Sequence, residues 1–259
     1  MAVRFRLGPP KKGLAFFEAF CDKIYFMPAK NRIKTYVEDS FYHIYNRGVE
    51  KRQIFMDEQD IGVFLSYLKT YLLPRDDKTL KDIIADPRKN PKERGDASRI
   101  LALNNFSTDL EMTAYTTMPN HFHFLIYQTA PDAIDRFMNS LGTRYTMYFN
   151  KRYKRVGPLF QGIYKGVLVE SDEQALYLSR YIHRNVRSLP SELQLQYPSS
   201  YPVYLGTSKQ EWVKPERILA HFSTAEYDSY REFVEIEDMD ENNKEAVTLS
   251  KVALDIESE

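Results

Sequence analysis

Two histidines separated by one residue are the first side chains in this sequence that indicate metal chemistry. His121 and His123 lie in a β-prone run, and side chains alternate between the two faces of a strand. Both imidazoles therefore project to one face, while Phe122 and Phe124 project to the other, so that two ring nitrogens can meet one cation. Two ligands leave a divalent ion under-coordinated, and a third must come from elsewhere in the chain. Histidines that only pack in a core or lie on a surface would also explain this short motif.

A helix further along the chain offers a nucleophile and a third ligand. Tyr181 and Asn185 are four residues apart, which places them on one face of a helix about one turn apart. The phenol can act as a nucleophile, and the amide oxygen is a hard metal ligand. Alternatively, Tyr177, Tyr181 and Asn185 are only the face of a helix that packs on a sheet.

The elements that must position these residues follow from hydrophobic periodicity and turn residues. Residues 111–118 and 121–128 are predicted strands, joined by Pro119 and Asn120 in a tight turn, so that together they form a hairpin. Ser171 is the predicted N-cap of the helix that carries Tyr181, with Gln174 completing a capping box. The remaining predicted elements are strands at 41–46 and 162–169, helices at 57–73 and 133–150, and a short helix near 214–222.

The order strand, helix, hairpin, helix, strand, helix predicts an α+β fold of the ferredoxin-like (RRM-like) kind, an antiparallel sheet with helices on one face. This domain is expected to span residues 41–190, after an N-terminal extension of residues 1–40. A polar stretch at about residues 74–105 contains Pro87, Pro91 and Gly95, and we interpret it as an insertion with a helical turn or two. Residues 191–231 are expected to form a C-terminal DNA-binding or accessory segment.

Composition excludes several classes of protein. The 259-residue chain has 36 basic and 36 acidic residues, and this zero net charge excludes a protein that coats polyanions through its overall charge. No apolar run approaches the roughly 20 residues that cross a bilayer, and the basic N-terminus lacks the apolar core of a signal peptide. The sequence therefore predicts a cytoplasmic protein without a membrane partner. The single cysteine, Cys21, is expected to pack rather than to bind metal or form a disulfide.

Charge is unevenly distributed along the chain. Residues 136–187 hold ten basic and three acidic residues, whereas residues 232–259 hold ten acidic residues and two lysines. A basic segment interleaved with tyrosines is typical of a surface that neutralises phosphates and stacks on bases. A solvated basic face without a ligand is the alternative. The acidic segment, residues 232–259, is expected to be a disordered tail.

Five short motifs are more specific together than any one of them alone. They are Tyr42–Gly48 (YHIYNRG), Met118–His123 (MPNHFH), Leu141–Asn150 (LGTRYTMYFN), Gly157–Gln161 (GPLFQ) and Ser179–Asn185 (SRYIHRN). Residues 42–222 thereby resemble the single-tyrosine HUH transposases, in particular the REP-associated tyrosine transposases and their insertion-sequence relatives. One departure is that Val186 follows Asn185, where relatives usually have proline, so the helix is expected to continue further.

The resemblance implies an HUH endonuclease fold and a role for each matching residue. His121 and His123 correspond to the paired metal ligands, Asn185 to the third ligand and Tyr181 to the nucleophile. The implied reaction cleaves single-stranded DNA at a hairpin-marked (palindromic) site, giving a 5′-phosphotyrosine and a free 3′-hydroxyl that can rejoin strands. Two imidazoles, an amide oxygen and open positions favour Mg²⁺ or Mn²⁺ over a closed zinc site. Because imidazolium cannot bind a metal, activity is expected to fall below about pH 6.

Further residues are predicted to contact DNA. Seven basic residues and one glutamine are candidates: Arg144, Lys151, Arg152, Lys154, Arg155, Gln161, Arg180 and Arg184. The accessory segment 191–231 is expected to add contacts. Tyr145 and Tyr148 fall on the apolar stripe of their helix and are expected to pack. His43 is expected to be a buried or bridging histidine, and His183 to point away from Tyr181.

Two other functions remain open from the sequence. One is a non-catalytic nucleic-acid-binding module of the same fold, which would need none of the four site residues in register. The other is a rolling-circle replication initiator or relaxase-type nickase. Such proteins commonly carry a second tyrosine or a third ligand histidine on the sheet, and neither is evident in the sequence. The sequence also leaves open which hairpin is recognised and whether the site assembles within one chain or across a homodimer.

Overall fold

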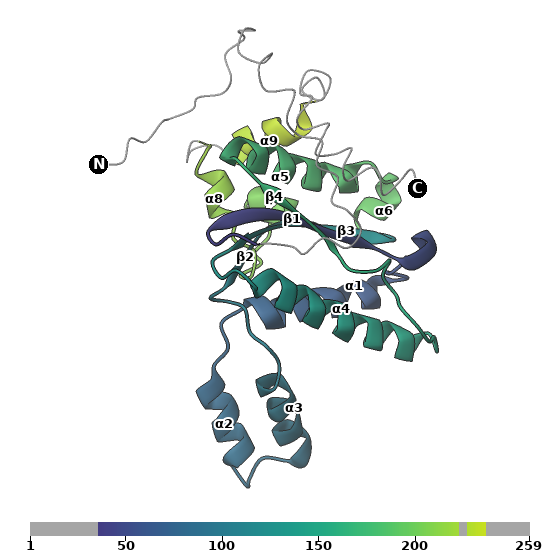
Figure 1. Ribbon diagram of the computed structural model, residues 1–259, viewed down its shortest axis with the longest axis vertical. Helices are drawn as coiled ribbons and strands as arrows, with labels where there is room; N and C mark the ends of the chain where they lie inside the picture. The colour runs from purple at the N-terminus through teal and green to yellow at the C-terminus, as the bar shows by residue number, and fades with distance from the viewer. Residues whose placement is uncertain (1–35, 223–226, 237–259) are drawn as a thin grey trace, which may run out of the picture.

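The structure is a computed structural model that describes residues 36–222 and 227–236. Four antiparallel strands form its centre. The strands are β1 (Ser40–Arg47), β2 (Leu110–Met118), β3 (His121–Gln128) and β4 (Lys165–Val169). Their order in the sheet is β2-β3-β1-β4, and every neighbouring pair is antiparallel. This is the split βαβ arrangement of a ferredoxin-like fold, so the predicted α+β class is confirmed (Figure 1).

Three long helices cover the sheet. Helices α1 (Glu58–Leu72) and α4 (Ala133–Arg152) lie on one face, and α5 (Asp172–Arg187) lies on the other (Figure 1). The prediction of helices on one face was therefore incomplete. The physical reason is that strand alternation also places Leu125 and Val169 on the second face, and the apolar stripe of α5 buries them.

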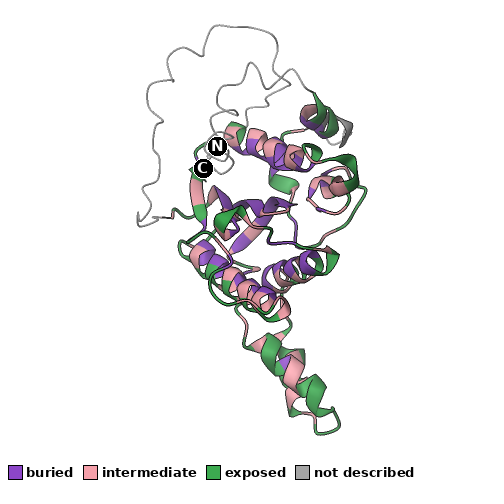
Figure 2. Ribbon diagram, turned by 90° about the vertical axis from the view of Figure 1, so that its right-hand side faces the viewer, coloured by how far each residue is buried: buried purple, intermediate pink, exposed green. Residues whose placement is uncertain are grey.

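The apolar face of the sheet carries most of the core. Tyr42 and Ile44 from β1 and Phe122 and Phe124 from β3 are buried there in one cluster with Phe64 of α1. Figure 2 shows the buried strands between the two helical layers. Because the side chains of successive residues point to opposite faces, this packing fixes where the side chains between them point. The residues that alternate with this core are therefore held on the α5 face.

The insertion after α1 is a helical hairpin that projects from the body (Figures 1 and 2). Its helices are α2 (Asp77–Ala85) and α3 (Pro91–Leu101), so the predicted turn or two of helix was an underestimate. Helix α3 begins with proline and a complete capping box between Asn90 and Glu93. Ala97 is the one buried residue of the two helices, which therefore contribute little to the main core.

The C-terminal part covers one sheet edge and the outer side of α5. Backbone hydrogen bonds join Thr117 to Pro198 (3.2 Å) and Lys214 to Met112 (2.8 Å), so residues 198–214 run beside the edge strand β2. Three short helices lie in this part: α6 (Ser191–Gln194), α7 (Tyr201–Tyr204) and α8 (Glu216–Leu219). A further short helix, η1 (Val49–Lys51), follows β1.

Helix α9 (Tyr227–Glu235) packs on α5. The predicted disordered tail began at residue 232, but residues 232–235 form the last turn of this helix, and its buried Val234 explains why. Residues 1–35 of the N-terminal extension, including Cys21, and residues 237–259 of the tail lie outside the described residues. Within the described part of the chain, no helix has both the length and the apolarity needed to cross a membrane.

Candidate active site

The helix that carries Tyr181 crosses the face of the sheet that carries the paired histidines. Helix α5 begins at its predicted N-cap, where the Ser171 hydroxyl accepts a hydrogen bond from the Gln174 amide (3.1 Å). Three turns later, the ring of Tyr181 lies 5.6 Å from that of His123 and 6.4 Å from that of His43, measured between centroids. Residues separated by almost 60 positions in the sequence are thus brought into contact.

Hydrogen bonds fix which nitrogen of each paired histidine is available to a ligand. His121 Nδ1 lies 2.7 Å from Oδ1 of Asn120, and because an amide oxygen only accepts, Nδ1 carries the proton. His123 Nδ1 lies 2.9 Å from Nε2 of His43. Both rings therefore have Nδ1 in a hydrogen bond, and Nε2 of His123 can bind a cation when its Nδ1 is the donor to His43. This is the pattern in which a second hydrogen bond orients a metal-binding histidine.

Burial keeps both imidazoles in the neutral form that a metal needs. Desolvation, with a smaller contribution from the positive charge of Arg47, lowers the pKa of His121 to about 4. Burial also lowers the pKa of His123 well below its usual value, and the neighbouring charges of His121 and His43 act in the same direction. The expected loss of activity near pH 6 therefore moves to more acidic pH, because these rings resist protonation more than exposed histidines do.

Asn185 is the predicted third ligand, and it lies on α5 one turn after Tyr181. Its Nδ2 donates to the carbonyl of Tyr181 one turn earlier (3.0 Å), while Oδ1 makes no hydrogen bond with any described residue. Two neutral imidazoles and an amide oxygen match the predicted Mg²⁺ or Mn²⁺ ligands. Among residues 36–222 and 227–236, no group of three histidine, cysteine or acidic side chains is arranged to hold a metal, so an amide ligand would be needed.

His43 is a third histidine on the same face of the sheet, and it bridges to His123 as expected. Its position beside the site was missed, although the polar residues His43, Tyr45 and Arg47 alternate with Tyr42, Ile44 and Asn46 and so share one face of β1. The prediction concerned a third ligand histidine on the sheet, and His43 is such a ligand only if it binds the cation directly. Because Nε2 of His43 is bound to His123, His43 acts as its hydrogen-bond partner and is not a third ligand in this arrangement.

Three arginines that were predicted to contact DNA form contacts within the protein. Arg152 forms ion pairs with Asp57 (2.6 Å) and with the fully buried Asp60 (2.5 Å). Arg180 is 3% exposed and donates to the carbonyls of Phe233 and Ile236, which joins α5 to α9. The guanidinium of Arg144 lies 3.8 Å from the ring centroid of Tyr67 on α1. These contacts within the protein hold the three side chains in place, and their predicted contacts with DNA remain predictions.

The other DNA-contact candidates differ in their surroundings. Arg155 donates to Asn150 (2.8 Å), Arg184 to the carbonyl of Ile236 (3.4 Å), and Gln161 accepts a hydrogen bond from Arg47. Lys151 and Lys154 are exposed, and their predicted contacts to the DNA backbone remain predictions.

Two tyrosines and one histidine lie where the sequence placed them. Tyr145 and Tyr148 pack between α1 and α4, with their hydroxyls bonded to Ile54 (2.6 Å) and Asp60 (2.9 Å). His183 is buried on another side of α5 from Tyr181. Its Nδ1 lies 2.7 Å from the hydroxyl of Tyr230, and its Nε2 lies 2.7 Å from the hydroxyl of Ser200. None of the three faces the paired histidines.

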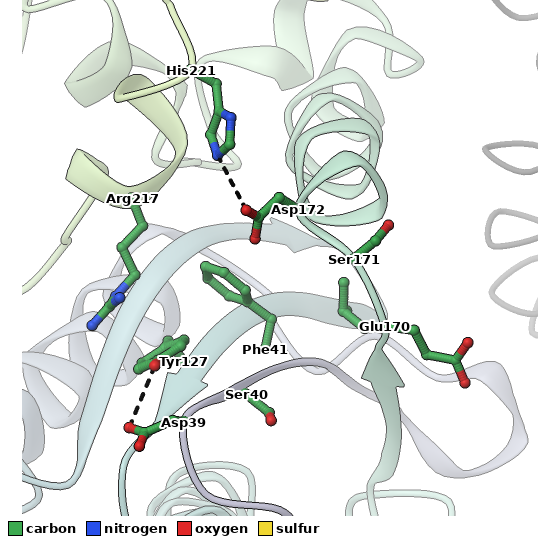
Figure 3. A pocket seen from close by; sticks show the side chains of 10 residues that line it. Asp39, Ser40, Phe41, Tyr127, Glu170, Ser171, Asp172, Arg217 and His221 are labelled. Atoms are coloured by element: carbon green, nitrogen blue, oxygen red, sulfur yellow. Dashed lines mark hydrogen bonds and ion pairs between the residues drawn. The ribbon is translucent and has the colours of Figure 1, made fainter. Parts of the chain in front are cut away.

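A cavity of about 420 Å³ lies at the start of α5, away from Tyr181 (Figure 3). It opens where β1 begins and β3 ends, the opposite end of this strand pair from His121. Charged groups there are paired with one another: Arg217 binds Glu111 (2.7 Å) and covers the ring of Tyr127, whose hydroxyl donates to Asp39 (3.4 Å). The candidate active site is therefore separate from this cavity.

Comparisons with known proteins agree with the predicted resemblance. A family described as "Transposase IS200 like" matches residues 93–185, the stretch that includes both paired histidines, Tyr181 and Asn185, and this confirms the resemblance to single-tyrosine transposases. No curated protein matches the chain. Among solved structures, a REP-associated tyrosine transposase bound to a REP hairpin is similar, with 9% identity and a TM-score of 0.44; the match covers 72% of this chain and 98% of that chain.

Proposed function

We propose that this chain is a transposase-like enzyme that cleaves and rejoins single-stranded DNA, with Tyr181 as the nucleophile. The observation that supports this most directly is the contact between the rings of Tyr181 and His123. A helix packed on a sheet for stability alone would not need a phenol, two neutral imidazoles and an amide oxygen on the same side. The match of residues 93–185 to IS200-like transposases supports the same function.

The proposed reaction exchanges one phosphodiester for another. The oxygen of Tyr181 attacks a DNA phosphorus, the bond to the 3′-oxygen breaks, and a 5′-phosphotyrosine forms. The phenol loses its proton and the departing 3′-oxygen gains one. Because the phosphotyrosine bond conserves the energy of the broken phosphodiester bond, the reaction needs no external energy source. His121, His123 and Asn185 would hold Mg²⁺ or Mn²⁺, which when bound polarises the phosphate. His43 and Asn120 orient the two imidazoles through their hydrogen bonds.

The substrate is predicted from the sequence resemblance. Single-tyrosine transposases act on sites marked by hairpins, and we propose that this chain recognises a single strand next to such a hairpin. Lys151, in the last turn of α4, and Lys154, just after this helix, are exposed and are candidates for contacts to its backbone.

Covalent trapping tests this proposal. The full chain is incubated with Mn²⁺ or Mg²⁺ and a pool of hairpin-bearing single-stranded oligonucleotides, and adducts are separated on a denaturing gel. We expect a protein–DNA adduct that is lost with a chelator and returns with excess metal. Tyr181→Phe should abolish it.

Tyr177→Phe is the matched control, because Tyr177 lies one turn earlier on α5 and packs against Phe233 of α9 (5.6 Å between centroids). An adduct that persists in Tyr181→Phe would exclude Tyr181 as the nucleophile. Binding of these oligonucleotides without any adduct would favour the non-catalytic module.

A further inference from the structure

Three sequence motifs that are distant in the chain meet at the end of the sheet next to His121. The amide of Gly48 donates to the carbonyl of Asn120 (2.8 Å), and the amide of Gln161 donates to the carbonyl of Arg47 (2.8 Å). The amide of Val49 donates to the carbonyl of Leu159 (2.9 Å). Gly48 has no room for a side chain, since a Cβ would lie 2.2 Å from the carbonyl oxygen of Arg52. This packing fixes the backbone on both sides of Arg47.

Arg47 lies directly opposite His121 on the α5 face. The two residues are paired in the register of β1 and β3, so their side chains project to the same side of the sheet. Arg47 is 8% exposed, and its Nε donates to the side-chain oxygen of Gln161. Its Nη1 is buried and has no hydrogen-bond partner in the described part of the chain.

This arginine is a buried cation without an anion. A guanidinium stays protonated at any physiological pH, and burying one is costly unless an opposite charge compensates. No carboxylate of the described residues forms an ion pair with Arg47, and Gln161, its side-chain partner, is neutral. Nη1 is therefore available to donate to a negatively charged group of a ligand.

We propose that Arg47 binds the scissile phosphate beside the metal ligands, an inference that rests on the proposed function. A guanidinium and a divalent cation held by His121 would repel each other across this short distance. A phosphate between them satisfies both, because its non-bridging oxygens accept from the arginine and bind the cation. In the pentavalent transition state these oxygens carry more charge, so the contact strengthens as the Tyr181–phosphorus bond forms.

Gln161 then has a role that differs from its predicted contact with DNA. By binding Nε, it holds the planar guanidinium so that Nη1 remains available. Lysine at position 47 would keep the charge but lose this orientation, because an ammonium group is a point charge on a flexible stem.

The test measures whether Arg47 and one phosphate of the DNA act together. Fluorescence anisotropy gives the affinity of the full chain for a single-stranded oligonucleotide, and for the same oligonucleotide with a neutral methylphosphonate at the linkage mapped by the adduct. The variants are Arg47→Gln, Arg47→Lys and, as the matched control, Arg99→Gln on the exposed helix α3. Thermal unfolding checks that each variant is folded.

We expect Arg47→Gln to weaken binding about tenfold and to slow adduct formation about 100-fold, as loss of a charge-stabilising donor does. The methylphosphonate should weaken binding by the wild-type chain and leave binding by Arg47→Gln unchanged. Arg47→Lys should retain most of the affinity but not the rate, and it replaces Arg47→Gln if that variant does not fold. An Arg47→Gln variant that responds to the methylphosphonate as strongly as the wild type, or an Arg47→Lys variant that forms the adduct at the wild-type rate, overturns the proposal.

Failure of the proposed function would give a different result. If the wild-type chain forms no adduct, the methylphosphonate is moved along the oligonucleotide one linkage at a time. A linkage whose neutralisation weakens binding only when Arg47 is present would retain Arg47 as a phosphate-binding residue and reject cleavage. The absence of any such linkage would reject both.

Discussion

The two faces of the sheet are built from the same strands but differ in what they do. On the face of α1 and α4, the alternating residues are Tyr42, Ile44, Phe122 and Phe124, all buried in one apolar cluster. On the α5 face, the residues between them are polar near the end of the strands that carries His121. That face becomes apolar only further along, at Leu125 and Val169.

The difference shows how one set of strands separates stability from chemistry. Apolar burial contributes the same stabilisation wherever it occurs, so one well-packed face can hold the strands in register. The other face can then carry side chains whose desolvation is unfavourable, including His43 and Arg47, each at most 8% exposed. Substitutions on the two faces should accordingly affect different measurements.

Adjacent residues of β3 give the largest predicted contrast. Phe124→Ala removes a fully buried ring from the apolar cluster and should lower the free energy of unfolding by about 3–5 kcal/mol. His123→Ala should cost less stability, about 1–3 kcal/mol from the lost hydrogen bond to His43, but should abolish the adduct. Urea unfolding and the gel assay measure the two effects. Equal losses of stability would contradict the separation of the two faces.

His43 tests how the polar face orients a metal ligand. His43→Ala should weaken Mn²⁺ binding about 10- to 100-fold, because His123 loses the partner that fixes its ring. His43→Gln keeps an oxygen that can accept from Nδ1 and should restore part of the affinity. Calorimetric titration of the full chain with Mn²⁺, without DNA, separates this effect from catalysis. Unchanged Mn²⁺ affinity in His43→Ala would leave His43 as a packing residue only.

His183 has a structural role, and we expect it to make the stability of the protein depend on pH. Burial lowers its pKa from 6.5 to about 3 in the folded protein. The unfolded chain therefore binds a proton below pH 6.5 that the folded chain does not, so stability is complete above pH 6.5 and is lost as pH falls toward 3. One such histidine makes the protein less stable at pH 5 than at pH 7 by roughly 2 kcal/mol. His183→Gln should reduce the pH dependence of urea unfolding by this amount, and an unchanged dependence would exclude His183.

Local signals in the sequence predicted the sheet and the core of the site. The turn residues Pro119 and Asn120 specify the hairpin, and the alternation of His121 and His123 with two phenylalanines specifies the face on which each lies. Ser171 sets the start of α5 and thereby the face that Tyr181 presents. Each of these depends on residues within a few positions of one another, so a single sequence contains them.

The partners of the arginines could not be predicted from local sequence signals. Arg152 binds aspartates 92 and 95 positions earlier, and Arg180 binds carbonyls 53 and 56 positions later. A basic segment counted along the sequence therefore suggested a DNA-binding surface, although tertiary contacts occupy several of its charges. The same limit concealed Arg47, since its pairing with His121 depends on the register of two strands.

The smallest predicted effect concerns the C-terminal end of α4, where cations bound within the protein and cations expected to contact DNA are neighbours. Arg152 is fixed to Asp57 and Asp60, whereas Lys151 and Lys154 are exposed. The double variant Lys151→Gln, Lys154→Gln should leave unfolding unchanged and weaken DNA binding only severalfold. Each lost phosphate contact on a single strand lowers the slope of log affinity against log salt by about 0.7, so the slope should fall by about 1.4. Lys209→Gln, in an exposed C-terminal segment, is the control. A slope unchanged by the double variant would mean that these lysines only solvate the surface, and that contacts to the DNA backbone come from the α5 side of the sheet.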